Sequence, residues 1–426
     1  MMSSIVKQTV FVFIGSVLTT YAIGAEVEYE ITIGAARSDN VARTDTFEIE
    51  ETIALLGLAL DVQHESRKVE ASLVADLEYR NYTDGIFDDE VVGSLYADLE
   101  LQLAQDVFSW VFENRFGNLV TNPFLANTPV NRQNINRFST GPDLILRFGS
   151  RTALEVGGRY HNTQFEISDI DNDVLGGRVS LVRALSAHRS ASLNITTDRI
   201  EFDDTTFNSS YDKQAAYFGF ESESSRSTLT VNLGYNELHD NGVVTDGYLI
   251  NVNWDREISP STTFNLGYNE GLTDAGFAFD QSQPGQGFGD PQRTAGVSDP
   301  FENRRFSVGL DFNRNSNIFF ATLSYNEDEY ITASVLDRDR SSLRLGFSRD
   351  FGSAWRFRLS GVLQKTDFVT TGREDDDATI SVGLSRQFSR KVGVNLNFTR
   401  FDRDSSDPGF NYVENVINLT FSYTRR

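Results

Sequence analysis

The chain of 426 residues contains no cysteine and only four histidines. Without cysteine it cannot form a disulfide scaffold, a thiolate metal site, an iron–sulfur cluster or a cysteine nucleophile. Four histidines leave little material for a multi-histidine metal centre. Basic residues are also scarce, because 38 Lys and Arg stand against 61 Asp and Glu, which gives a net charge of −23. This acidic balance argues against nucleic acid as a partner, since binding to phosphates needs a positive face.

Long apolar runs are also missing after residue 25, where no stretch approaches the roughly 18 apolar residues of a transmembrane helix. Before it, Lys7 precedes the apolar residues 10–18, and the small residues of 22–25 follow. This order predicts a secretory signal peptide over residues 1–25. A short membrane anchor is the alternative, although so short an apolar core does not cross a bilayer comfortably. Residues 26–426 are then either soluble in an exported compartment or inserted in a membrane as a β-barrel.

Apolar and polar residues alternate along the whole chain. In residues 392–399, valine, leucine and phenylalanine alternate with glycine, asparagine and threonine. The same period of two occurs in residues 71–79, 229–236, 248–255, 306–313 and 355–364. Because successive side chains of a strand point to opposite faces, each segment predicts a strand with one apolar and one polar face. A soluble sandwich alternates too, with its apolar face turned inward, so this pattern alone does not decide between the two folds.

Two further features favour a membrane barrel. The polar face is rich in Asn, Gly, Ser, Thr, Arg and Asp, which suit a wet interior. Aromatic residues also gather near the expected strand ends, as girdles at two lipid–water interfaces would require. We expect five residues to belong to these girdles: Tyr235, Tyr268, Tyr325, Phe401 and Tyr423.

The connections between the expected strands alternate in length, and this is the strongest of the signals. Short turns are predicted near residues 63–68, 105–107, 149–151, 186–189, 222–227, 257–262, 314–317, 350–354 and 388–391. Longer acidic loops are predicted at residues 81–90, 117–134, 162–173, 203–212, 271–303, 327–339, 367–377 and 402–411. An outer-membrane barrel has short periplasmic turns and long extracellular loops. We therefore predict an all-β fold, a transmembrane antiparallel up-and-down barrel of about 20 strands (18–20), in one domain over residues 26–426.

The same alternation predicts which charged side chains line the interior. We expect the acidic lumen residues to lie on early strands and the basic ones on later strands. The charged residues that we predict to line the lumen are Glu78, Asp98, Glu100, Arg159, Arg178, Arg344, Arg356 and Arg358. Acidic and basic walls can restrict the passage of charged solutes. Alternatively, these charges pair with one another and stiffen the wall.

The longest predicted loop, residues 271–303, contains Phe277, Phe279 and Phe288 with several glycines and prolines. A loop of this length is usually functional or disordered. It either folds into the barrel mouth as a constriction or projects outward. Residues 117–134 are a second candidate for a loop that narrows the pore.

Signs of catalysis or metal binding are weak. His239 and Asp240 stand side by side, as in a barrel protease resembling the omptins, but a facing acidic pair is supplied only by the general abundance of acids. Acidic runs at residues 169–173, 375–377 and 402–407 fit solvated loops, or loops bridged to lipopolysaccharide by divalent cations. We expect no enzyme activity, no catalytic residue, no cofactor and no resident metal.

The last strand resembles the C-terminal signal that the outer-membrane barrel assembly machinery reads. Apolar residues stand at 417, 419, 421 and 423, whereas Arg425 and Arg426 replace the usual terminal aromatic residue. In length, signal peptide, acidic loops and Tyr-Asn-rich hairpins, the whole chain is similar to Gram-negative outer-membrane barrels encoded with exopolysaccharide export and sorting systems.

The resemblance implies a role in export or anchoring of surface polysaccharide, with outer-membrane lipid, lipopolysaccharide, polysaccharide and periplasmic export components as partners. A general diffusion porin is one alternative. A closed structural or adhesive barrel without transport is the other.

Overall fold

The computed structural model describes residues 24–206, 208–240, 242–280 and 297–425. Within them, 20 antiparallel strands form one sheet. The first ten are β1 (Glu26–Ser38), β2 (Glu51–Glu65), β3 (Val69–Tyr82), β4 (Glu90–Ala104), β5 (Phe108–Val120), β6 (Arg132–Phe148), β7 (Thr152–Phe165), β8 (Asn172–Ser186), β9 (Arg189–Phe202) and β10 (Tyr211–Ser224). The second ten are β11 (Ser227–Asp240), β12 (Val243–Ser259), β13 (Thr262–Thr273), β14 (Phe301–Arg314), β15 (Asn317–Tyr330), β16 (Arg338–Phe351), β17 (Trp355–Phe368), β18 (Arg373–Gln387), β19 (Val392–Ser405) and β20 (Tyr412–Arg425).

Helical structure is minor. The helix α2 (Ala275–Asp280) follows β13, and the 3₁₀ turns η2 (Pro129–Asn131), η3 (Ser334–Leu336) and η4 (Pro408–Phe410) lie in three of the connections. No described helix has both the length and the apolar character needed to cross a membrane. The architecture is therefore carried by the strands alone.

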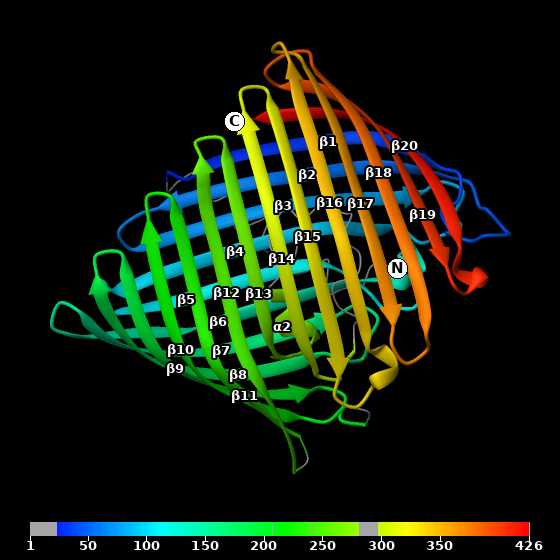
Figure 1. The fold of residues 1–426 in the computed structure, drawn as a ribbon. Coiled ribbons are helices and arrows are strands. Elements are labelled where there is room, and N and C mark those ends of the chain that lie inside the picture. Colours follow the sequence, from blue (N-terminus) through cyan, green and yellow to red (C-terminus); the bar gives the residue numbers. More distant parts are fainter. Residues whose placement is uncertain (1–23, 207, 241, 281–296, 426) are drawn as a thin grey trace.

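The sheet closes on itself. Tyr29–Ser38 of β1 pairs antiparallel with Val416–Arg425 of β20, so the first and last strands are neighbours. Figure 1 shows the blue β1 beside the red β20, with the remaining strands completing the wall. Closure leaves no strand edge with unpaired amide and carbonyl groups, which is a condition for spanning a lipid layer with strands.

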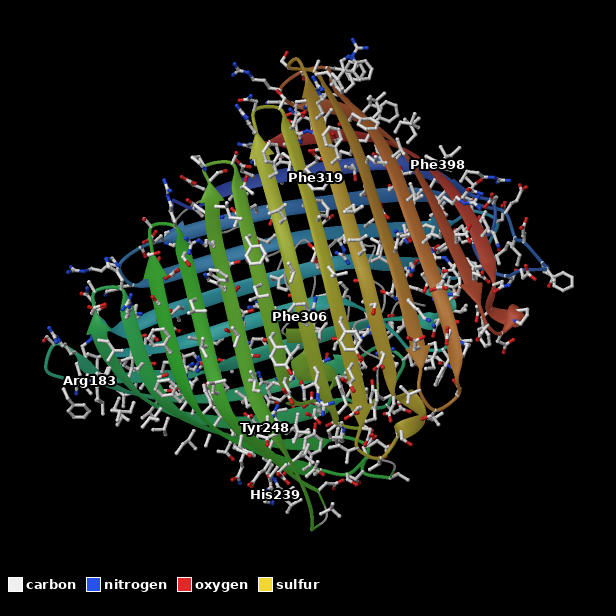
Figure 2. All side chains as sticks on the ribbon, viewed as in Figure 1. Arg183, His239, Tyr248, Phe306, Phe319 and Phe398 are labelled. Carbon is white, nitrogen blue, oxygen red and sulfur yellow. The ribbon has the colours of Figure 1, made fainter. Side chains whose placement is uncertain are left out.

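The pairing register places inward-facing residues of one strand beside inward-facing residues of the next, and outward-facing residues beside outward-facing ones. Inward-facing pairs are polar, such as Asn232 with Asn251 and Ser324 with Ser342. Many outward-facing positions are apolar and exposed, such as Leu233, Leu323, Leu396, Leu419 and Phe421. In Figure 2 the labelled Tyr248, Phe306, Phe319 and Phe398 belong to this outward set. A closed barrel with an apolar exterior is an outer-membrane barrel, and the predicted fold class and location are confirmed.

The nine predicted short turns are all present and lie at one end of the barrel, which we call the short-turn end. Asp106 and Asn315 adopt positive φ values of 57° and 56° in two of them, a conformation that Asp and Asn tolerate better than most residues. The first residues of β1 and the last residues of β20 also lie at this end. The short-turn end is therefore the periplasmic end, and the opposite end, the long-loop end, is extracellular.

The long loops are shorter than predicted, because the strands continue beyond the apolar zone. The predicted loop at residues 367–377 is reduced to 369–372, since β17 ends at Phe368 and β18 begins at Arg373. A connection at residues 39–50 was not predicted, and neither was the tight turn between β11 and β12. In these strand extensions, acidic residues are paired with basic residues of neighbouring strands. The acidic composition that we interpreted as a sign of loops therefore belongs in part to strands.

One girdle assignment was wrong. Phe401 pairs with Thr379 and Glu414 on the inner face, so it does not reach lipid. The alternation that turns Phe398 outward requires residue 401 to point inward. The other four predicted girdle residues share the outward face.

Apolar side chains also meet inside the barrel, near the long-loop end. This inner cluster joins inward-facing residues of β5–β11 and β13 to the segment after β13; its members are Leu119, Ile135, Phe165, Ile170, Val174, Ile200, Phe202, Tyr211, Leu238, Leu272, Ala275 and Phe279. An aqueous pore would leave these side chains in water. The interior is therefore filled at this level along one side of the wall.

Candidate functional site: the lumen and its outer mouth

The helix α2 lies inside the barrel. Its Ala275 and Phe279 side chains are 3% and 8% exposed, although the helix belongs to the connection between β13 and β14. The Phe279 ring covers Gly117 of β5 so closely that a Cβ added at Gly117 would lie 2.9 Å from it. Because β5 and β13 are eight strands apart along the wall, α2 reaches far across the lumen.

Phe277 is held by cationic side chains of the facing wall. Lys213 Nζ lies 3.4 Å from the centroid of the Phe277 ring, and the Arg137 guanidinium carbon lies 4.5 Å from it. The His161 ring meets the same ring edge-on, with 5.9 Å between centroids. Cations over an aromatic face are attracted by the ring quadrupole, so these contacts fix α2 against β6, β7 and β10.

Asp274 anchors the start of the helix. The Tyr211 hydroxyl donates a hydrogen bond to Asp274 Oδ2 at 2.9 Å, and the Phe277 amide donates to Asp274 Oδ1 at 2.9 Å. The second of these is a helix-capping hydrogen bond. Tyr211 and Asp274 are both buried. The inward position of α2 is therefore supported by polar contacts as well as by ring packing.

A second segment crosses the outer mouth. We call residues 121–131, which join β5 to β6, the strap. Arg373 of β18 donates a hydrogen bond to the Phe124 carbonyl at 2.8 Å, and the Phe124 ring lies 5.1 Å from the Phe368 ring. Arg43, in the connection between β1 and β2, donates to the Asn127 carbonyl at 3.0 Å. The strap thus joins β5 and β6 to strands on the opposite side of the barrel.

The sequence did not point to the anchors of the strap. Arg43 is itself held by Glu414 at 2.8 Å and lies over the Phe401 ring at 4.3 Å. Arg373 lies 4.0 Å from the Phe410 ring and is paired with Asp375 at 2.8 Å. No local spacing signals contacts between residues so distant in the chain. The sequence offered one signal only: the alternation of side chains along the strands places Phe401, Arg373 and Asp375 on the inner face.

The predicted lumen residues share the inward-facing register. Arg159 and Arg178 both pair with Asp143, at 2.5 and 3.1 Å, and Asp98 pairs with Arg115 at 2.6 Å. The remaining positions lie as follows: Glu78 pairs with Arg80, Arg356 with Asp350, Glu100 accepts from Gln102, and Arg344 and Arg358 lie on the inner face of β16 and β17. Charge pairing is therefore frequent along this wall.

The inner face of β11–β13 is rich in asparagine and also carries Asp255. Asn232, Asn251, Asn253, Asn265 and Asn269 face inward at adjacent register positions. Asn251 donates to Asn269, and Asn253 donates to Asn251 at 3.0 Å. Amide groups offer both donors and acceptors, as hydroxyl-rich solutes require.

Two buried ion-pair networks lie near the long-loop end. Asp328 of β15 accepts from Arg338 at 3.2 Å and from Arg340 at 2.8 Å, and its side chain is 1% exposed. On β18 and β19, Arg403 binds Asp377 through two hydrogen bonds and approaches Asp375 at 3.5 Å. Sequence reasoning assigned these residues to solvated loops. Their extension into paired strands explains the difference.

The candidate chemistry does not assemble. His239 faces outward and lies 3.3 Å from Glu237, whereas Asp240 faces inward, so the two side chains lie on opposite sides of the wall. No group of three or more metal-ligating side chains occurs among the residues that the structure describes. Phe288 and the predicted signal peptide up to residue 23 lie outside the described residues.

Comparison with known proteins gives likenesses of fold. No family model and no curated protein matches the chain. It is similar to the siderophore receptor PirA from Pseudomonas aeruginosa, at 10% identity over 94% of this chain and 80% of that chain, with a TM-score of 0.48. It is also similar to OccK2 (OpdF) from Pseudomonas aeruginosa, at 12% identity over 94% and 97% of the two chains, with a TM-score of 0.39. It is similar as well to the alcaligin outer-membrane receptor FauA from Bordetella pertussis, at 12% identity over 94% of this chain and 75% of that chain, with a TM-score of 0.40. Identities this low give no information about ligands.

Proposed function

We propose that the barrel is a restricted passage across the outer membrane, narrowed near its outer mouth. The inward position of α2 carries this proposal: Phe277 and Phe279 contact the wall formed by β5–β7 and β10. Barrels of 16–18 strands leave an aqueous channel, so a wall of this size leaves room for solute beside an inserted helix. A narrowed mouth disfavours the general diffusion porin.

We propose surface exopolysaccharide as the solute that is exported or anchored. The resemblance of the sequence to barrels of exopolysaccharide loci suggests this substrate, and the asparagine-rich inner face of β11–β13 supports it. Neighbouring inward amides such as Asn251 and Asn269 can exchange hydrogen bonds with sugar hydroxyls as a chain advances. The acidic and basic sectors on either side would restrict charged solutes.

The closed structural barrel is the second candidate. It is favoured by the strap, because Phe124 is bound by Arg373 and Phe368 from β18 and β17 across the mouth, and Asn127 is bound by Arg43 from the connection between β1 and β2. If these contacts persist in the membrane, the outer end stays shut. We propose no enzymatic role, since His239 and Asp240 diverge.

Single-channel conductance in planar bilayers separates these candidates. We expect the wild type to pass a small current. F277A/F279A should pass a larger one, because the ring contacts that hold α2 are removed. The matched control is F306A/F319A, which removes two outward-facing rings and should leave the current unchanged. No current in any of the three proteins would reject the passage and favour the closed barrel.

The substrate is tested separately. Oligosaccharides added to the conducting barrel should reduce its current in proportion to chain length, whereas amino acids of similar charge should not. Deletion of the gene should remove polysaccharide from the cell surface. Conductance without either effect would retain the passage and reject the polysaccharide.

A further inference from the structure

The outward side chains at the short-turn end carry charge of one sign. Within four residues of the short turns or of the last residue of β20, the outward positions of the described strands include seven arginines and no carboxylate. We call these seven the arginine belt: Arg183, Arg189, Arg256, Arg314, Arg349, Arg386 and Arg425. Figure 2 shows nitrogen-tipped side chains along this edge, with Arg183 labelled among them.

The pairing register establishes that the belt faces outward. Arg349 is opposite Phe357, and Arg386 is opposite Trp355 and Val394, all of which share the outward face. On β12, β14, β16, β18 and β20 the belt occupies alternate strands, so its members are spaced about 10 Å apart along the wall. All seven side chains are exposed.

Aromatic rings on the same face hold several belt members at the edge of the apolar zone. The Arg386 guanidinium carbon lies 5.0 Å from the Trp355 ring and 5.0 Å from the Phe388 ring. Arg349 lies 5.1 Å from Phe351. Rings of this kind occupy the lipid–water interface of membrane proteins. The guanidinium groups therefore lie at the depth of lipid headgroups rather than in the periplasm.

Five members of the arginine belt have no internal counter-charge among the described residues. Arg183, Arg256, Arg314, Arg349 and Arg386 form no ion pair with any residue in the described part of the chain. The opposite end has the reverse pattern. There the outward-facing Arg304 is surrounded by four carboxylates at 3.0–3.6 Å: Glu270, Glu302, Glu327 and Glu329.

We propose that the arginine belt binds the phosphate groups of anionic phospholipids in the periplasmic leaflet. A guanidinium presents paired N–H donors that match phosphate oxygens, and here no carboxylate on the same face competes for them. The apolar residues beside the belt take the acyl chains of the same lipids. A soluble periplasmic protein fits this surface less well, because the belt adjoins the lipid-facing wall.

The native tryptophans provide the assay. All three, Trp110, Trp254 and Trp355, face outward on the half of the wall nearer the short turns. The full chain is reconstituted in phosphatidylcholine vesicles that contain either dibrominated phosphatidylglycerol or dibrominated phosphatidylcholine at the same mole fraction. Bromine quenches tryptophan fluorescence on contact, so the ratio of the two quenching constants measures the preference for the anionic lipid.

We expect the wild type to prefer phosphatidylglycerol by about fivefold, as a guanidinium near an anionic lipid surface predicts. R256Q/R349Q/R386Q should reduce the ratio to about one, and high salt should reduce it in the wild type. The matched control, R37Q/R199Q/R400Q, removes three exposed outward arginines at the long-loop end and should keep the ratio.

Equal quenching by the two lipids in the wild type would overturn the proposal, and this result does not depend on whether a variant folds. A ratio that survives in R256Q/R349Q/R386Q, with the folded barrel verified by its heat-modifiable mobility on gels, would overturn it as well. Neither result bears on conductance, so the proposed passage is tested independently.

Discussion

Replacing Asp328 by asparagine should destabilise the barrel far more than replacing Asp350, although both aspartates face inward and pair with arginine. Asp328 is 1% exposed and neutralises Arg338 and Arg340, which are 1% and 9% exposed. Its other oxygen accepts from Asn303 at 2.7 Å and from Asn326 at 3.0 Å. D328N removes the carboxylate that the buried Arg338 and Arg340 share. Breaking a buried pair in this way costs about 3–5 kcal/mol.

Asp350 is the matched control. It binds Arg356 at 2.5 and 3.0 Å, but the two side chains are 41% and 47% exposed. Water replaces the lost charge, so D350N should lower the free energy of unfolding by only about 0–1 kcal/mol. Urea unfolding in vesicles, followed by tryptophan fluorescence, measures both variants. A loss for D328N no larger than that for D350N would refute the assignment of the stabilisation to buried charge.

Further outcomes test the mouth and the wall. G117V should raise the single-channel current, because its side chain meets the Phe279 ring and displaces α2; G361V, on a lipid-facing position, should not. R373Q removes the hydrogen bond to the Phe124 carbonyl, and we expect faster protease cleavage in residues 121–131, with an unchanged rate contradicting the strap as described. D143N removes the carboxylate that Arg159 and Arg178 share, so the reversal potential in a KCl gradient should shift toward anion selectivity. An unchanged reversal potential would mean that these two arginines lie away from the ion path.

The barrel itself was predictable because its signals are local. A period of two sets the face of each side chain, and the short turns set the strand count, as for the turn after Arg314. Where the period is ambiguous, the fold still resolves it: Leu55 and Leu56 are consecutive and apolar, and the register turns Leu55 inward and Leu56 outward. Both positions accept an apolar residue because β2 is part of a closed wall.

The contents of the mouth were not predictable in the same way. The sequence identified Phe277 and Phe279 as candidates but left their direction open. Their direction is decided by Lys213 and Gly117, which are far away in the chain and have no spacing that would indicate the contact. Charged residues such as Asp328 were also misread, because burial through pairing with arginine leaves no mark on hydropathy.

The junction of β1 with β20 constrains how the molecule can be made. Glu30 accepts a hydrogen bond from Thr424, a partner 394 positions later, and this neighbourhood exists only once nearly the entire polypeptide is available. Joining such distant segments is entropically expensive, so the ring should be the last part to form. Until then two strands present unsatisfied edges. A chain that lacked β20 would therefore be an open sheet with two unpaired edges and a tendency to self-associate, rather than a slightly smaller closed barrel.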